Sequence, residues 1–464
     1  MLVFYEYTKA EMLAYLKEQA PHAEIHVQDE VSQKHAANGR ATNEMAGNLL
    51  AYVVVSDTAD IKGVLKTARK FHLPVIPQSG DTSTVIGADG IDGGLILSTA
   101  KLNHIKKISP DDGIAVVESG VVNGDLDKAA RKQGLFYAPD PASRPISTVG
   151  GNVATNAGGM STVKYGATKD AVLGLKVILA DGRELTLGGQ TYKQAFGYDL
   201  TQLFVGSEGT LGIITEITVR LLPIPVGEAV TGIAFFENMS VLATAVRDLR
   251  MSGIAPVMLE ALDSKTVVAL DKYEHQHYAN GTTAMLIFKL DAGGQESLAI
   301  AKKVLTQDHA TNIQVTTDPK KSDELLKLRQ DMLPAIFIDS NHIMEDMAVP
   351  LSKLAEMMDY IAKVADELDV DIYTAGHAGD GNVHPSLLWS KDEPNPPAKV
   401  IEATRRLLEK TLALGGTISG EHAVGMLKNQ WTNAELGFDV DELQHAVKHL
   451  FDPMGILNPK RKIN

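Results

Sequence analysis

Two histidines and a glutamate near the C-terminus have the residue types and spacing of a metal site. Gly376-His-Ala-Gly-Asp-Gly-Asn-Val-His-Pro385 holds His377 and His384 around a Gly-Asp-Gly sequence that favours a turn over a helix. If Asp380-Gly381 is the two-residue turn of a β-hairpin, the two histidines pair directly, with Cβ atoms about 5 Å apart. Glu421 can supply a third ligand. Two imidazoles and a carboxylate suit Zn²⁺ or another borderline divalent ion, with positions left open for substrate.

Each of these residues also has a simpler interpretation. A single histidine here could be an ordinary loop histidine, and Glu421 an exposed glutamate. Two histidines around one turn, together with Gly420-Glu-His422, favour the site. Arg329, in Leu325-Leu-Lys-Leu-Arg-Gln330, is a candidate for a bidentate clamp on a substrate carboxylate. The alternative for Arg329 is a solvated arginine on a helix face.

Three glycine-rich clusters in the first half of the chain have the composition of an anion cradle. They are PQSGDTST at 77–84, TVGGNVATNAGGM at 148–160 and GSEGTLG at 206–212. Glycine permits positive φ and close backbone approach, so runs of N–H groups can converge on a phosphate. One cluster alone indicates tight turns, but three within ~150 residues favour a large phosphate-bearing ligand. The Rossmann and P-loop fingerprints are missing, so neither an NAD site nor a P-loop nucleotide site is expected.

The order and content of these clusters resemble the FAD-binding domain of the vanillyl-alcohol oxidase and p-cresol methylhydroxylase flavoproteins. The resemblance is greatest to the FAD-linked oxidases, which include the glycolate oxidase catalytic subunit, D-lactate dehydrogenase and D-2-hydroxyglutarate dehydrogenase. It runs from about residue 50 to the end of the chain. The residues that carry it are Pro139-Asp-Pro-Ala-Ser143, 148–152, 155–159, Tyr165-Gly166, 205–214 and 451–460.

This resemblance implies an FAD site built from the glycine-rich clusters, with 77–84 and 148–159 around the pyrophosphate and 206–214 against the isoalloxazine and ribityl. The residues expected to bind FAD are Pro77, Ser79, Gly80, Asp81, Thr82, Ser83, Gly87, Pro141, Thr148, Gly150, Gly151, Asn152, Thr155, Asn156, Gly158, Gly159, Tyr165, Gly209, Gly212, Ile213 and Ile214. Where relatives read Arg-Gly-Gly-Gly-Thr, this chain has Gln78-Ser-Gly-Asp-Thr82, which weakens the electrostatic stabilisation of phosphate there. Because the chain has no cysteine and this loop no histidine, we expect non-covalent FAD.

The histidine and glutamate motifs match the family patterns H-x-G-D-G-N-x-H and G-E-H-G-x-G. In relatives these supply metal ligands and a catalytic histidine, which map onto His377, His384, Glu421 and His422. Ala423 stands where glycine is usual. Asn382 can hydrogen-bond substrate, and the position of Arg329 matches an arginine of the family. Zinc is the first expectation for the metal, with manganese and iron as alternatives.

These parts indicate oxidation of a D-2-hydroxy acid such as D-lactate, glycolate or D-2-hydroxyglutarate. A bound cation lowers the pKa of the substrate hydroxyl, His422 takes the proton, and the Cα hydride passes to flavin N5. One alternative is a metal-free sugar or aldonolactone oxidase on the same scaffold. Another is a flavin-carrying, non-catalytic subunit of an electron-transfer assembly.

Hydrophobic patterning predicts the elements that must position these residues. A β-branched run at 49–56, an amphipathic segment at 57–72 and an apolar run at 73–76 predict a β-α-β opening. Beyond the prolines of 221–225, strands such as 230–236 alternate with amphipathic helices, including 239–251 and 351–368. We expect an α+β protein. Residues 1–222 should form a p-cresol methylhydroxylase-type FAD-binding domain, and residues 223–416 a substrate-binding α+β cap domain with an antiparallel sheet. The C-terminal segment, 417–464, should return to the FAD-binding domain.

Composition limits the partners. The 464 residues include 44 Lys+Arg and 58 Asp+Glu, a net charge of −14 with no long basic block, so we expect no nucleic-acid partner. The absence of cysteine excludes disulfides and thiolate metal sites. Met1–Tyr7 lacks a secretory pattern, and the apolar runs are shorter than the ~20 residues of a membrane span. We expect a cytoplasmic protein, compatible with peripheral membrane association. The electron acceptor (quinone, electron-transfer flavoprotein, cytochrome or oxygen) and the oligomeric state, a homo-oligomer included, stay open.

Overall fold

The computed structural model describes residues 7–36, 48–275, 277–278 and 284–463. The chain divides into two compact units. Unit 1 comprises Met1–Gly158, Ala167–Ile224 and Glu421–Asn464, and unit 2 comprises Gly159–Gly166 and Pro225–Gly420. The predicted α+β class is confirmed, because both units combine helices with mostly antiparallel sheets. Among the described residues, no helix has the length and apolar character that a membrane crossing requires.

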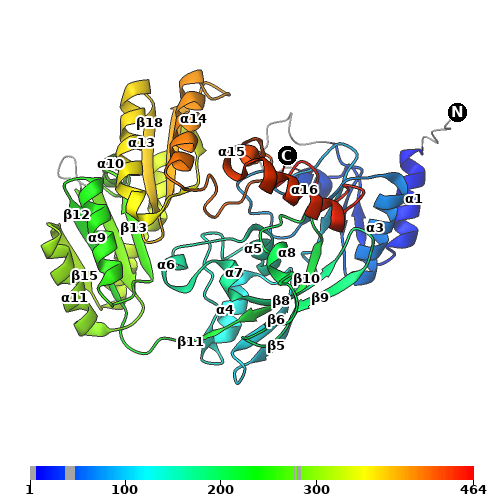
Figure 1. Ribbon diagram of the computed structural model, residues 1–464, viewed down its shortest axis with the longest axis horizontal. Helices are drawn as coiled ribbons and strands as arrows, with labels where there is room; N and C mark the ends of the chain where they lie inside the picture. Colours follow the sequence, from blue (N-terminus) through cyan, green and yellow to red (C-terminus); the bar gives the residue numbers. More distant parts are fainter. Residues whose placement is uncertain (1–6, 37–47, 276, 279–283, 464) are drawn as a thin grey trace. The chain divides into compact units, whose positions relative to one another are not determined.

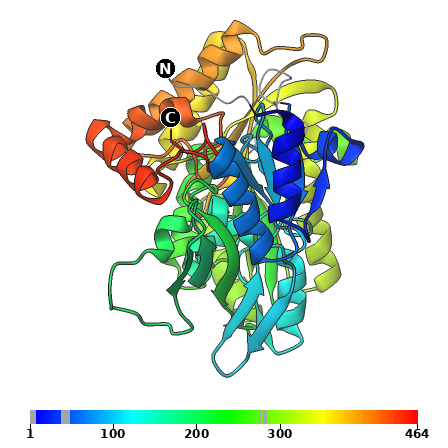
Figure 2. The ribbon, with the colours of Figure 1, turned by 90° about the vertical axis from the view of Figure 1, so that its right-hand side faces the viewer.

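The first sheet of unit 1 contains the predicted β-α-β opening. Its strands, in spatial order, are β1 (Glu24–His26), β2 (Ala51–Val54), β4 (Leu95–Ser98) and β3 (Val75–Gln78). Both β2 and β3 run parallel to β4, so β4 lies between the two strands that helix α3 (Thr58–Phe71) connects. The Asp57 side chain caps α3 by accepting a hydrogen bond from the backbone N–H of Asp60. Helix α1 (Lys9–Gln19) lies beside α3 (Figure 2).

The second sheet of unit 1 is antiparallel, and its strands alternate along the chain with the glycine-rich clusters. In spatial order its strands are β5 (Ile105–Ser109), β6 (Ile114–Glu118), β10 (Ile213–Arg220), β8 (Val172–Ile178) and β9 (Glu184–Gly188), and a separate ribbon pairs β7 (Leu135–Phe136) with β11 (Leu222–Pro223). The other helices of unit 1 are α2 (Glu30–Ala36), α4 (Asn123–Arg131), α5 (Val149–Thr155), α7 (Thr168–Ala171), α8 (Thr201–Phe204), the 3-10 turn η2 (Asn429–Trp431), α15 (Thr432–Leu436) and α16 (Phe438–Phe451).

The C-terminal segment is part of the core of unit 1. Leu457 forms a parallel β-bridge with Val75, and the backbone N–H of Asn458 donates to Val75 O at 2.8 Å. Leu457 packs with the first sheet, and Phe451 packs with the second. The last part of the chain therefore joins the two sheets of unit 1.

A partly buried lysine anchors α16 to this core, and its removal is expected to lower stability. Lys448 Nζ donates to Asp452 Oδ2 at 2.5 Å and to the carbonyls of Thr210 and Leu457 at 2.7 and 2.8 Å. Lys448→Met leaves the Asp452 carboxylate buried without its cation, which should cost about 3 kcal/mol. Thermal unfolding followed by circular dichroism measures the loss. Lys128→Met, which removes an exposed pair with Asp125, is the control and should cost less than about 1 kcal/mol. An equal effect of the two variants would contradict the assignment.

Unit 2 is built on one antiparallel sheet. In spatial order its strands are β15 (Thr311–Thr316), β12 (Val230–Phe236), β14 (Ala284–Leu290), β13 (Met258–Leu262), β18 (Asp371–His377), β19 (Asn382–Ser390) and β16 (Ser340–Met344), and β17 (Met347–Ala348) also pairs with β19. Its helices are α6 (Thr162–Tyr165), α9 (Met239–Met251), α10 (Ser264–Glu274), α11 (Gly294–Gln307), α12 (Pro319–Phe337), the 3-10 turn η1 (Leu351–Lys353), α13 (Leu354–Leu368) and α14 (Ala398–Ala413). Strand β12 and helix α9, both labelled in Figure 1, are elements of this unit. Their bounds are the predicted ones.

One face of this sheet packs against α10 and α12. Apolar side chains of both helices form a single buried cluster with alternate residues of the strands. In β13, Met258 and Leu262 belong to this cluster, and in β18 Ala375 does. Because side chains alternate along a strand, Glu260 and His377 lie on the same face. Glu260 and His377 therefore lie among apolar side chains on the inner face of the sheet, the face that packs against α10 and α12.

Candidate functional site

The candidate site is a row of side chains on three neighbouring strands of unit 2. The register places Glu260 of β13 opposite His377 of β18, and His377 opposite Asn382 of β19. His384 lies two residues beyond Asn382, so it points to the same face. The His377 and His384 rings are 5.3 Å apart, with an angle of 84° between their planes. Both histidines are buried.

The register predicted for the histidine hairpin is wrong by two residues. The connection is Ala378–Gly381 rather than a two-residue turn, so His384 pairs with Ala375 and not with His377. Gly381 has a φ of +85°, and a Cβ atom there would lie 2.2 Å from the Val349 carbonyl oxygen. The close packing of the Val349 carbonyl against Gly381 makes the turn wider than two residues. A shift of two residues keeps every side chain on its face, so the two rings are still neighbours.

Glu260 connects a histidine to an arginine and was not predicted from the sequence. It is 1% exposed; its Oε1 lies 2.5 Å from His377 Nδ1, and its Oε2 accepts from Arg329 Nε at 2.5 Å. Burial alone would raise the pKa of Glu260, but the neighbouring His377 and Arg329 outweigh it and lower that pKa to about 2. The signal in the sequence was a single glutamate at an inward position of an apolar strand, Val257-Met-Leu-Glu-Ala-Leu262.

The Glu260 contact determines how His377 presents its ring. An ionised carboxylate only accepts hydrogen bonds, so Nδ1 of His377 must carry the proton. In the neutral imidazole, Nε2 is then the nitrogen that carries the lone pair. A carboxylate on the second nitrogen is the usual support of a metal-binding histidine. The donor chemistry of this side chain therefore fits a divalent ion.

Arg329 reaches the row from α12, the helix that covers this face. Its side chain is 17% exposed and is held at Nε by Glu260. No other hydrogen bond of Arg329 occurs within the described part of the chain, so its two terminal Nη groups are available. Two parallel N–H groups in one plane match the geometry of a carboxylate.

Asn382 is held by its amide nitrogen and offers its oxygen. Nδ2 donates to Asp346 Oδ1 at 2.8 Å and to the Met347 carbonyl at 2.9 Å. Its Oδ1 is buried and accepts no hydrogen bond from any described residue. Asp346 is 1% exposed and also lies 3.7 Å from His384 Nδ1. Asn382 can therefore accept a hydrogen bond at the site, while Asp346 orients it.

Glu421 and His422 follow unit 2 directly in the chain. Gly420, the last residue of unit 2, lies so close to Asn382 that a Cβ atom on it would be 2.2 Å from Asn382 Nδ2. Within unit 1, the Glu208 carboxylate accepts from the backbone N–H groups of Val424 and Gly425 at 3.0 and 2.7 Å. The third glycine-rich cluster thus anchors the backbone that follows His422.

The three glycine-rich clusters meet in unit 1. The backbone N–H groups of Gly206 and Glu208 donate to carbonyls of α5 at 2.8 and 2.7 Å, which joins the third cluster to the second. Gly209 has a φ of +72°, and a Cβ atom on it would lie 2.8 Å from Pro77 Cγ in the first cluster. Thr148 Oγ1 donates to Ser79 Oγ at 2.8 Å, which joins the first cluster to the second. The spacing of the clusters already favoured one large phosphate-bearing ligand, and the resemblance implied that they surround it.

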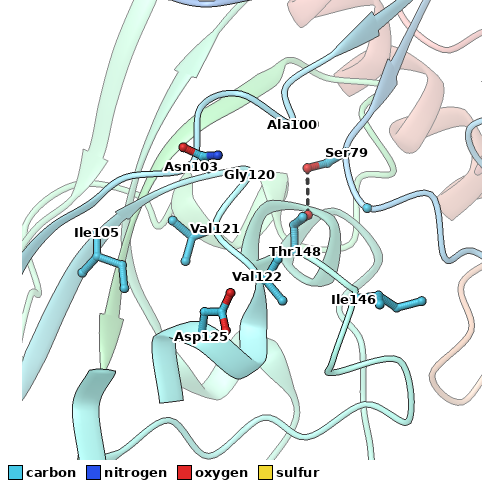
Figure 3. A pocket seen from close by; sticks show the side chains of 11 residues that line it. Ser79, Ala100, Asn103, Ile105, Gly120, Val121, Val122, Asp125, Ile146 and Thr148 are labelled. Atoms are coloured by element: carbon cyan, nitrogen blue, oxygen red, sulfur yellow. Dashed lines mark hydrogen bonds between the residues drawn. The ribbon is translucent and has the colours of Figure 1, made fainter. Parts of the chain in front are cut away.

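A cavity of about 350 Å³ opens where the first two clusters meet (Figure 3). Ser79, Gly80, Gly120 and Thr148 line it. Buried polar atoms near these clusters have no hydrogen-bond partner among the described residues: Ser119 Oγ, Ser147 Oγ, Asn152 Nδ2 and Ser207 Oγ. Each such atom costs about 1–3 kcal/mol unless a ligand satisfies it. Unit 1 therefore fits a polar, phosphate-bearing cofactor.

Two of the residues expected at the cofactor belong to unit 2. Gly159 and Tyr165 lie in Gly159–Gly166, apart from the other expected residues, which are all in unit 1. The Tyr165 hydroxyl donates to Asp291, and Lys164 Nζ lies 2.5 Å from the same carboxylate. Burial and the Asp291 carboxylate raise the pKa of Tyr165. In this structure Tyr165 ties Gly159–Gly166 to the rest of unit 2.

Comparison with known proteins gives two family matches. Residues 49–188 match an FAD binding domain, and residues 227–461 match the C-terminal domain of FAD linked oxidases. Glycolate oxidase subunit GlcD of Bacillus subtilis (strain 168) is 35% identical over 413 residues, 88% of each chain. D-lactate dehydrogenase of Anaerostipes hadrus is 34% identical over 474 residues, 98% of each chain.

Solved structures show the same fold. p-Cresol methylhydroxylase with substrate bound superposes with a TM-score of 0.79 at 18% identity and covers 98% of this chain and 97% of its own. 4-Ethylphenol oxidase from Gulosibacter chungangensis gives a TM-score of 0.78 at 18% identity, covering 100% and 99%. Together with the family matches, these likenesses show that this chain belongs to the FAD-linked oxidase family and has the p-cresol methylhydroxylase-type fold.

Proposed function

We propose that this protein is an FAD-dependent dehydrogenase that oxidises a D-2-hydroxy acid of the lactate, glycolate or 2-hydroxyglutarate class to the 2-oxo acid. The observation that carries the proposal is the row of Arg329, Glu260, His377 and Asn382, with His384 beside it, on one face of unit 2. A carboxylate clamp and a pair of imidazoles suit a substrate with adjacent carboxylate and hydroxyl groups. Relatives named glycolate oxidase subunit and D-lactate dehydrogenase support the same class.

Each residue has a distinct part in this proposal. The Nη groups of Arg329 bind the substrate carboxylate, and Asn382 Oδ1 accepts a hydrogen bond from the substrate. His422 takes the proton of the hydroxyl as general base. His377, His384 and Glu421 would hold a divalent ion, zinc first and manganese or iron as alternatives; when bound, such an ion lowers the pKa of a coordinated hydroxyl. Non-covalent FAD in unit 1 supplies the acceptor for two electrons.

The test is an anaerobic screen of flavin bleaching with metal analysis of the same sample. D- and L-lactate, glycolate, D- and L-2-hydroxyglutarate, free sugars and aldonolactones are added separately to the oxidised protein. We expect bleaching by a 2-hydroxy acid, faster for the D enantiomer, and a bound divalent metal ion. Bleaching by a sugar or lactone alone, in metal-free protein, would support the oxidase alternative. No bleaching by any substrate would support a flavin-carrying subunit. The screen also leads to the acceptor, since quinone, electron-transfer flavoprotein, cytochrome or oxygen can then be offered to the reduced protein.

A glycine variant tests the proposed place of the FAD pyrophosphate. A Cβ atom on Gly80 would lie 3.0 Å from the Thr148 backbone nitrogen and 3.1 Å from Ser147 Cα. Gly80→Ala should therefore push the first cluster from the second and weaken FAD binding about tenfold, equivalent to about 1.4 kcal/mol. The flavin-to-protein absorbance ratio after gel filtration measures the effect. Gly189→Ala is the matched control, because a Cβ atom there meets nothing within 4 Å. Equal flavin content in Gly80→Ala and Gly189→Ala would contradict the proposed position of the pyrophosphate.

A further inference from the structure

We propose that Glu260 is a positioning residue for the reaction: one buried carboxylate that sets both the tautomer of His377 and the direction of Arg329. The inference rests on the proposed function, which assigns these two side chains to the metal ion and to the substrate carboxylate. Glu260 touches neither group in this assignment. It acts through the two residues that do.

Each carboxylate oxygen of Glu260 contacts a different side chain. Oε1 faces His377 Nδ1 and Oε2 faces Arg329 Nε, both at 2.5 Å. The first contact crosses from β13 to the neighbouring strand β18, where the two residues are direct partners in the register. The second reaches the helix that covers this face. The carboxylate therefore joins a strand and a helix that each carry one functional group.

A carboxylate is the side chain that satisfies both neighbours at once. His377 Nδ1 and Arg329 Nε must both donate, and an ionised carboxylate accepts at either oxygen. Glutamine has nearly the same shape but accepts at one end only and donates at the other. If the NH₂ group of the glutamine faces Arg329, it meets Nε–H, and two hydrogen-bond donors point at each other. If its NH₂ faces His377, Nδ1 must accept, and the proton moves to Nε2, the nitrogen needed for the metal.

Asp263 is a nearby carboxylate with a purely structural role, in contrast to Glu260. Asp263 directly follows the same strand and is partly buried. Its side chain accepts from the backbone N–H groups of Thr266 and Thr374, both at 2.8 Å, and so caps α10 and ties it to β18. Of its two carboxylate oxygens, neither contacts an arginine or a histidine within the described residues. Asp263→Asn is therefore a matched control for Glu260→Gln.

The experiment measures zinc binding and substrate kinetics on the full-length protein. Metal-stripped wild type, Glu260→Gln and Asp263→Asn are titrated with Zn²⁺ against a chromophoric chelator. Anaerobic reduction of the flavin by D-lactate, or by the best substrate of the screen, gives the apparent substrate affinity. For Glu260→Gln we expect zinc affinity to fall about 10- to 100-fold and substrate affinity to fall at least about tenfold, with unchanged flavin content. For Asp263→Asn we expect a lower melting temperature and wild-type values for both affinities.

The outcomes distinguish this inference from the proposed function. If the wild type binds no metal ion and no 2-hydroxy acid reduces its flavin, the proposed function fails first. If the wild type does both and Glu260→Gln matches it in both affinities, or if Asp263→Asn loses as much, the positioning role is overturned. If Glu260→Gln does not fold, Glu260→Asp takes its place. That variant keeps an acceptor-only group with a shorter reach, and zinc affinity equal to the wild type would overturn the inference.

Discussion

Replacement of His384 by alanine is expected to leave a folded, yellow protein whose flavin is reduced by a 2-hydroxy acid about a thousandfold more slowly. The change removes one imidazole of the neighbouring pair on the inner face of unit 2. A bound cation is worth several kcal/mol to a reaction that develops negative charge on oxygen, and about 4 kcal/mol corresponds to a factor of a thousand. The glycine-rich clusters of unit 1 are untouched, so FAD should remain bound.

Stopped-flow absorbance under anaerobic conditions measures this rate, and metal analysis of the same variant measures its zinc content. His342→Ala is the matched control. His342 lies on β16, the strand that pairs with β19, but it is exposed and its ring stacks on Phe337. We expect this control to change the rate less than twofold. Reduction of the His384→Ala flavin at the wild-type rate, with metal retained, would refute the assignment of His384 as a ligand.

The second large effect is expected for Arg329→Met. Losing a bidentate, charged contact with the substrate carboxylate should raise KM by roughly a hundredfold or more, because each charge-assisted hydrogen bond contributes about 1.5–3 kcal/mol. Arg329→Lys keeps the positive charge but lacks the planar fork, so it should recover only part of the loss. Steady-state kinetics with a chemical electron acceptor give KM and kcat separately for each variant.

Lys327 offers a matched control on the same helix. It lies two residues from Arg329, is 58% exposed and pairs with Glu274 and Asp331 on the surface. Lys327→Met should leave KM within about twofold, since exposed ion pairs contribute little. If Arg329→Met raised KM no more than Lys327→Met, the clamp would have to be another residue.

Local pattern was enough for the separate elements of unit 2. The predicted strand 230–236 and helix 239–251 coincide with β12 and α9, because an apolar run and the Asn238 cap are local features. The predicted helix at 351–368 is also present, although its first turn is the 3-10 turn η1. Such features depend on neighbouring residues only, and a single sequence contains them completely.

The arrangement of the histidine pair was only partly predictable from the local sequence pattern. His377 and His384 stay on the same face of the sheet when the register of the hairpin shifts by two residues. Their face was therefore predictable from their spacing. The register was not, because the Val349 carbonyl packs against Gly381 and sets the width of the turn. The predicted pairing was therefore wrong while the neighbouring rings were confirmed.

The sequence by itself determined the residue types, the face on which each strand residue lies, the glycine-rich clusters and, by resemblance, the family. Only the tertiary structure decided that β13 lies beside β18, which brings Glu260 to His377 and to Arg329, and that the first two glycine-rich clusters meet at a cavity. The reason is physical. The order of strands in a sheet and the packing of a helix over it depend on contacts between residues far apart in the chain. The periodicity within one segment carries no information about its neighbour.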